Sequence, residues 1–132
     1  MITLSKDMEV GIAKIDSQHR ELIDRINAVT LMGSKSFSKD ETQKTLDLLG
    51  EYIVKHFADE EALQQQSNYP KYEWHKKQHQ IYIDEFNKLK SEFTVNGSST
   101  KFTLALSKSI IAWIVKHIKF ADAELGRYLK GK

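Results

Sequence analysis

Residues 46–63 read LDLLGEYIVKHFADEEAL. Apolar and ligand-type side chains recur in this segment three and four positions apart, at Leu46, Leu49, Ile53, His56, Glu60 and Leu63. Because an α-helix turns once in about 3.6 residues, this spacing places all of them on one face. A helix with such a face buries it against other helices, so the segment predicts one member of a helical bundle.

Three more segments carry the same period, and clusters of Gly, Pro, Ser and Asn separate them. The sequence therefore predicts four helices, at about residues 16–32, 39–66, 70–93 and 99–120. Short connections make neighbouring helices antiparallel. We expect an all-α, up-down-up-down four-helix bundle with a short N-terminal arm and a C-terminal extension.

Residues with helix-capping chemistry lie near the expected ends. Asp16 is the expected N-cap of the first helix, Ser38 or Asp40 that of the second, and a residue within 98–100 that of the fourth. Pro70 suits the first turn of the third helix. Residues 123–132 are expected to be a frayed basic end.

Composition limits the class of protein. A chain of 132 residues is expected to form one domain, residues 1–132. The net charge is +2 with acids and lysines interleaved, so we expect no nucleic-acid or membrane partner. There is no cysteine, which excludes disulfides, thiolate zinc sites and cysteine-ligated clusters. Residues 1–10 lack a signal-peptide core, and a cytoplasmic location is expected.

All five histidines fall into one pattern with two carboxylates: His19, His56 and Glu60, His75 and His79, and His117 and Asp122. Residues four apart on a helix lie on one face, about 6 Å apart along the axis. Five residues correspond to about 500° of rotation, which leaves Asp122 about 140° away from the face of His117. We therefore expect the last helix to unwind or end near Asp122.

These side chains occupy core-facing positions, and residue counts from the turns bring them to similar heights in the bundle. A single such histidine is more often a surface residue or a core histidine bonded to a carbonyl. Buried carboxylates, however, need compensating charge, which a cation supplies. The seven are therefore predicted metal ligands. Imidazole and carboxylate suit iron, whereas zinc, the main competing metal, uses four ligands.

The residues that carry a family resemblance are IDSQH at 15–19, HFADEE at 56–61, HKKQH at 75–79 and WIVKH at 113–117, followed by Asp122. In that order they resemble the hemerythrin family, in particular its single-domain bacterial members, over about residues 4–129. The combination is specific, although each motif alone is weak. Two positions depart from many bacterial members, which carry Trp where Leu4 stands and Met where Gln64 stands.

The resemblance implies two non-haem iron ions with an oxo or hydroxo bridge. It assigns His75, His79 and His117 to one iron, His19 and His56 to the other, and Glu60 and Asp122 to both. The second iron then has an open position, where family members bind dioxygen reversibly. Nitric oxide or azide-like anions are further candidate ligands of this position.

Reversible dioxygen binding for transport, storage or delivery is therefore the expected function, rather than an enzyme activity. Two carboxylates are fewer anionic donors than di-iron oxygenases use to stabilise high-valent iron. The alternatives are a di-iron enzyme, a protein that handles nitric oxide or peroxide, or an oxygen sensor that acts through a separate partner.

Apolar walls are needed around a bound gas, because water and protons promote oxidation of the centre. Ile114, Trp113 and Phe57 are the predicted pocket residues. Ile114 stands three residues before His117, where the resemblance places an aliphatic side chain beside the gas. An ordinary core position is the alternative interpretation of Ile114.

Overall fold

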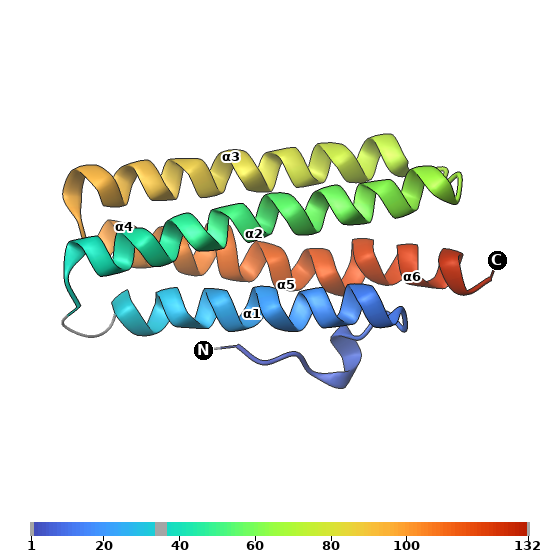
Figure 1. Ribbon diagram of the computed structural model, residues 1–132, viewed down its shortest axis with the longest axis horizontal. Coiled ribbons are helices and arrows are strands. Elements are labelled where there is room, and N and C mark those ends of the chain that lie inside the picture. Colours follow the sequence, from blue (N-terminus) through green and yellow to red (C-terminus); the bar gives the residue numbers. More distant parts are fainter. Residues whose placement is uncertain (1, 34–36, 132) are drawn as a thin grey trace.

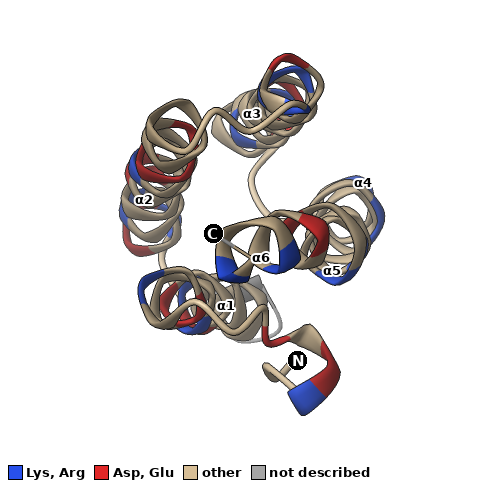
Figure 2. Cartoon of the chain, turned by 90° about the vertical axis from the view of Figure 1, so that its right-hand side faces the viewer, with Lys and Arg blue, Asp and Glu red and all other residues tan. Residues whose placement is uncertain are grey.

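Four helical rods lie side by side in the computed structural model, which describes residues 2–33 and 37–131 (Figure 1). The first three are α1 (Ala13–Gly33), α2 (Lys39–Gln66) and α3 (Tyr72–Asn96). The fourth rod is a series of helical segments: α4 (Thr100–Ala105), η2 (Leu106–Ala112), α5 (Trp113–His117), η3 (Ile118–Asp122) and α6 (Ala123–Lys130). Viewed from one end, the rods surround a common axis (Figure 2). The expected antiparallel all-α four-helix bundle is confirmed.

Two of the expected N-caps are present. Ser38 accepts a hydrogen bond from the backbone N–H of Glu41, whose side chain in turn accepts from the backbone of Ser38. Ser99 accepts from the N–H of Phe102 at 3.0 Å and begins α4. Gly97 ends α3 with φ of 66°, a left-handed conformation that favours glycine. In the predicted loop between α1 and α2, Ser34, Lys35 and Ser36 lie outside the described residues.

Two expected helix starts are wrong. Helix α1 begins at Ala13, so Asp16 lies in its first turn and is not its N-cap. The carboxylate of Asp16 instead accepts the backbone N–H groups of Val10 at 2.8 Å and Gly11 at 3.1 Å, so it closes the turn before the helix. Helix α3 begins at Tyr72, after Pro70, whose turn is closed by a hydrogen bond from the N–H of Tyr72 to the carbonyl of Tyr69.

The fourth rod is longer than expected. Helical structure continues to Lys130 rather than ending near residue 120, and the predicted frayed end is wrong. Leu125 is fully buried, and Gly126 lies so close to the N-terminal arm that a Cβ there would stand 2.4 Å from the carbonyl oxygen of Val10. The hydroxyl of Tyr128 also donates to the carbonyl of Ser67 at 2.7 Å. Packing therefore holds this end in place.

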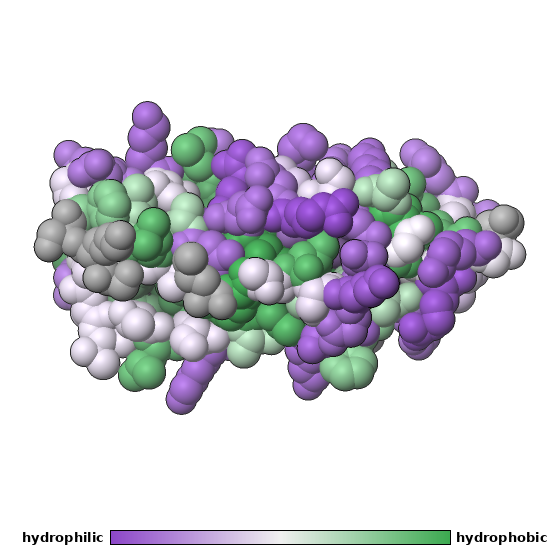
Figure 3. Space-filling view, turned by 90° about the horizontal axis from the view of Figure 1, so that it is seen from below, coloured by the Kyte–Doolittle hydropathy of each residue, from purple (hydrophilic) through white to green (hydrophobic). Residues whose placement is uncertain are grey.

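The N-terminal arm lies against the fourth rod. Its short 3₁₀ helix η1 (Lys6–Met8) buries Met8, and Asp7 pairs with Lys119 at 3.2 Å. The face seen from below in Figure 3 mixes charged and apolar side chains. None of the helices described combines the length and apolar character needed to cross a membrane.

Candidate metal centre

Each rod brings at least one predicted ligand to the middle of the bundle. Their positions are His19 on α1, His56 and Glu60 on α2, His75 and His79 on α3, His117 on α5, and Asp122 at the end of η3. All seven are buried, and His117 is the most exposed of them at 5%. The structure therefore collects the whole set in the interior.

The segment between His117 and Asp122 differs from the expectation that the helix unwinds or ends there. Segment η3 is a π-helix, and α6 continues directly from it. A π-helix closes hydrogen bonds between residues five apart, so its wider turn brings such residues close to one face. Asp122 Oδ1 consequently lies 3.1 Å from Nε2 of His117.

The two carboxylates divide the five histidines into two groups. Oε1 of Glu60 lies 3.2 Å from Nε2 of His75 and 3.1 Å from Nε2 of His79. Its other oxygen, Oε2, lies 3.3 Å from Nε2 of His56 and 3.6 Å from Nε2 of His19. We call His75, His79 and His117 the three-histidine group. We call His19 and His56 the two-histidine group.

Asp122 divides its oxygens in the same way. Oδ1 lies 2.9 Å from Nε2 of His75, in the three-histidine group, and Oδ2 lies 2.9 Å from Nε2 of His19, in the two-histidine group. Within each group, possible ligand atoms of the histidines and both carboxylates lie within 4.8 Å of one another. A carboxylate that serves two groups with separate oxygens has the geometry of a bridging ligand.

The chemistry of this donor set fits metal ions better than direct hydrogen bonds. Although His19 Nε2 and Asp122 Oδ2 are 2.9 Å apart, neither atom has a hydrogen-bond partner among the described residues. Nε2 of His75 and Nε2 of His117 lie 3.0 Å apart. Adjacent ligands of one octahedral ion, each at about 2.1 Å, stand about 3 Å from each other. The nitrogens and oxygens therefore point to shared positions between them.

Without a metal, protons compensate the carboxylates. Burial lowers the pKa of His19, but contacts with Asp122 and Glu60 outweigh it and raise that pKa to about 10. The same balance raises the pKa of His75 to about 9. Burial alone raises the pKa of Glu60, yet the charge of His56 and contacts with His19 hold it well below the usual value. Metal binding must therefore displace protons.

The outer nitrogens of two histidines have partners. Gln18 donates from Nε2 to Oδ2 of Asp59 at 2.8 Å, which fixes the orientation of its amide. Its Oε1 therefore faces Nδ1 of His56 at 2.8 Å and accepts a hydrogen bond from the N–H of that ring. Nδ1 of His79 likewise lies 2.7 Å from Oε2 of Glu61. Both contacts leave Nε2 free to bind a metal.

Gln18 and Glu61 are functional candidates that the ligand motifs did not reveal. Each stands directly beside a predicted ligand in the chain, as Gln18 does beside His19 and Glu61 beside Glu60. This adjacency could have identified both residues as candidates from sequence, but it does not predict which histidine each of them contacts. Gln18 contacts His56, on a different helix, rather than its neighbour His19.

The three predicted pocket residues take different places. Ile114 is buried in the apolar core. Phe57 lies flat against the ring of His79, with ring centres 3.8 Å apart and planes at 2°. Trp113 stacks on His117, with ring centres 4.7 Å apart and ring planes at 13°. It is partly exposed and also lines a surface pocket. Phe57 and Trp113 thus contact clustered histidines, and the role of all three residues around a gas is a proposal.

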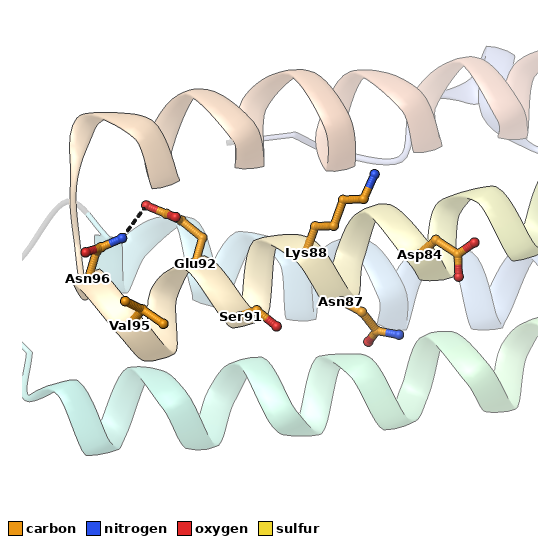
Figure 4. A pocket seen from close by; sticks show the side chains of 7 residues that line it. All are labelled: Asp84, Asn87, Lys88, Ser91, Glu92, Val95 and Asn96. Atoms are coloured by element: carbon orange, nitrogen blue, oxygen red, sulfur yellow. Dashed lines mark hydrogen bonds between the residues drawn. The ribbon is translucent and has the colours of Figure 1, made fainter.

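A larger surface groove of about 500 Å³ runs along α3 between Asp84 and Asn96 (Figure 4). Its lining includes charged and polar side chains such as Lys88 and Glu92, and Glu92 accepts a hydrogen bond from Asn96. None of the seven clustered residues lines it. The buried cluster is therefore the candidate site.

A sequence model of the hemerythrin HHE cation binding domain matches residues 10–129. The chain belongs to the hemerythrin family. Hemerythrins generally bind dioxygen and are not generally enzymes, and membership supports non-haem iron as the metal.

Individual relatives agree with this hemerythrin assignment. A bacteriohemerythrin of Stenotrophomonas maltophilia is 27% identical over 123 residues, 92% of this chain and 77% of that protein. A bacteriohemerythrin of Clostridium acetobutylicum is 28% identical over 127 residues, 94% of this chain and 98% of that protein. Myohemerythrin of Sipunculus nudus is 32% identical over 103 residues, covering 77% and 78% of the two chains.

Proposed function

We propose that the seven clustered residues hold two iron ions and that the protein binds dioxygen reversibly at one of them. The observation that carries this proposal is the division of oxygens. Glu60 and Asp122 each direct one oxygen to the three-histidine group and the other to the two-histidine group. A single ion gives no reason for this arrangement, whereas two bridged ions require it.

The unequal numbers of histidines support a gas-binding position at the second ion. Three histidines and two carboxylate oxygens would supply five ligands to the first ion, and a shared oxo or hydroxo group would complete six. Two histidines and two carboxylate oxygens would supply four ligands to the second ion, and the same bridge would make five. An open coordination position distinguishes a reactive site from a closed one. It therefore lies beside His19 and His56, where nitric oxide or azide is a competing ligand.

A pair of ferrous ions supplies the two electrons that dioxygen binding at such a centre uses. The protein's part is to hold the ligands and to limit access of water and protons. Ile114 and Phe57 belong to the buried apolar core, and Phe57 contacts both His56 and His79. A dry surrounding favours release of the gas over its reduction.

The polar contacts around the site favour binding over catalysis. Gln18 and Glu61 contact the outer Nδ1 atoms of His56 and His79, on the far side of each ring from the cluster. From there they orient ligands and do not reach the open position. A di-iron enzyme would need a proton donor or base close to the reacting atoms.

The test is optical spectroscopy of the iron-loaded, reduced protein under argon, in air, and again under argon. The proposal expects a ligand-to-iron charge-transfer band that appears in air and disappears when the gas is removed. Zinc-loaded protein is the control and stays colourless. Absence of the band, or steady consumption of dioxygen with a reductant, would contradict reversible binding.

A further inference from the structure

A pocket of about 330 Å³ opens at the surface between α3 and the fourth rod. We call it the aromatic pocket, and its lining includes Trp74, Gln78, Trp113, Lys116, His117 and Phe120. Trp74 and Phe120 are large apolar side chains that are 49% and 68% exposed. Exposed aromatic side chains gathered around a hollow are typical of a binding site.

The aromatic pocket is connected to one half of the candidate metal centre. His117 is one of its lining residues, and the ring of Trp113 stacks on this histidine with ring centres 4.7 Å apart. The rings of Trp74 and His75 lie edge to face, with their centres 6.1 Å apart. Both histidines belong to the three-histidine group. The pocket therefore borders that group directly at His117 and through the rings of Trp113 and Trp74.

The three-histidine group is not the half of the centre where we propose that the gas binds. The proposed open position lies beside His19 and His56, whereas the three-histidine group has a full set of ligands. A molecule in the aromatic pocket can reach the proposed ion through ring contacts but cannot coordinate it. The arrangement is suited to electron transfer, which needs short distance and no coordination vacancy.

The lining also indicates the chemistry of the occupant. Aromatic side chains offer their faces or edges to a planar ring system. Lys116 is exposed and forms no ion pair within the described ranges, so its ammonium is free to meet an anion. None of the described residues that line the pocket is acidic. A flat, redox-active ring with an anionic group matches these features.

We propose that the aromatic pocket binds flavin mononucleotide, and that the reduced form of this flavin returns an oxidised centre to the diferrous state. The reduced flavin gives up two electrons and two protons and becomes oxidised flavin. Each ferric ion takes one electron, one proton goes to the bridging oxygen and the other goes to solvent. This inference rests on the proposed function only for the electron acceptor. Binding of the flavin itself does not depend on iron.

The first test is therefore titration of flavin mononucleotide into zinc-loaded protein, followed by quenching of flavin fluorescence. We expect saturable binding of one flavin per chain. Phe120→Ala combined with Lys116→Glu should weaken it at least about tenfold. The matched control is Leu104→Ala with Lys108→Glu, two exposed positions on the same rod, and should bind normally. No saturable quenching, or equal binding by both double variants, would overturn the site.

Riboflavin separates the contribution of the phosphate from that of the ring. If Lys116 meets the phosphate, Lys116→Glu alone weakens binding of flavin mononucleotide and leaves riboflavin binding unchanged. Equal loss for both compounds would contradict this contact. The comparison uses the same zinc-loaded protein, so it gives a result even if the protein does not bind dioxygen.

The second test measures the rate at which reduced flavin mononucleotide or dithionite bleaches the oxidised iron protein under argon. The Phe120→Ala, Lys116→Glu variant should slow reduction by the flavin at least about tenfold and leave reduction by dithionite unchanged. Flavin binding without this selective loss would overturn the redox role. Failure of the protein to bind two irons would contradict the proposed function and leave the titration result standing.

Discussion

The side-chain oxygen of Gln18 lies 2.8 Å from Nδ1 of His56, on the side of the imidazole that faces away from the metal cluster. The contact holds the proton of His56 on Nδ1 and orients the ring, although Gln18 and His56 come from different helices. Asp59 keeps the amide in this orientation.

Gln18→Leu should therefore lower the affinity of the two-histidine ion, because His56 loses the partner that orients it. Loss of such a partner typically weakens metal binding about 10–100-fold. Competition with an iron chelator measures the affinity. Gln80→Leu is a matched control, since Gln80 is exposed and bonds only to Asp84 one turn away. Equal iron retention by the two variants would show that the contact does not support the site.

Ile114→Ala should oxidise in air several-fold faster than the parent, because a cavity in the proposed gas pocket would admit water. It should also cost about 2–5 kcal/mol of unfolding free energy, as expected for a buried aliphatic side chain. The measurement is the rate at which the oxygenated spectrum decays. Ile110→Ala makes a comparable cavity one turn earlier in the core. An unchanged rate, or the same acceleration in both variants, would remove Ile114 from the pocket.

The stability of the metal-free protein should fall as pH rises from 6.5 to 9. The pKa of His19 is raised to about 10 and that of His75 to about 9, so the folded state holds protons that the unfolded state releases above about pH 6.5. Their stabilising contribution is complete below pH 6.5 and is lost toward the folded pKa values. Denaturant unfolding should show a loss on the order of a few kcal/mol.

The same measurement on zinc-loaded protein provides the contrast. A bound metal takes the place of the protons, and its affinity rises with pH because ligands must be deprotonated. Zinc-loaded protein should therefore lose less stability over this range. If the metal-free protein gains stability between pH 6.5 and 9, the described pairing of His19 with Asp122 is wrong.

Gln64→Met should raise the free energy of unfolding by about 1–2 kcal/mol, because Gln64 is fully buried and its amide has no partner among the described side chains. Methionine has a similar length and no such requirement. Thermal and denaturant unfolding of metal-free protein measure the change. Gln65→Met, at an exposed neighbouring position, should have little effect. Destabilisation by Gln64→Met would mean that the amide is satisfied.

The helical period made much of this structure predictable from sequence. His56 with Glu60, and His75 with His79, could be placed on shared faces because regular helices fix residues four apart. Asp122 could not be placed correctly, since the π-helical turn that brings it beside His117 depends on packing and breaks the regular period. The sequence pattern required a break there but did not indicate its form.

The sequence pattern also did not predict the contacts that decide where the first helix begins and the last helix ends. The C-terminal helix persists because Gly126 fits against Val10, and nothing in its local sequence reports that approach. Asp16 looked like a helix cap, yet its carboxylate serves the turn before the helix. The Gly126–Val10 approach is a tertiary contact, whereas the Asp16 contacts are local hydrogen bonds that compete with its role as a helix cap.

X-ray absorption spectroscopy of the iron-loaded protein tests the bridged pair most directly. Glu60 and Asp122 should hold two irons close enough to give a metal–metal scattering shell below about 4 Å, together with nitrogen and oxygen ligands. Asp122→Asn should weaken that shell as one bridge is lost. Iron surrounded by nitrogen and oxygen, with no second iron within that distance in the parent protein, would contradict the two-ion site.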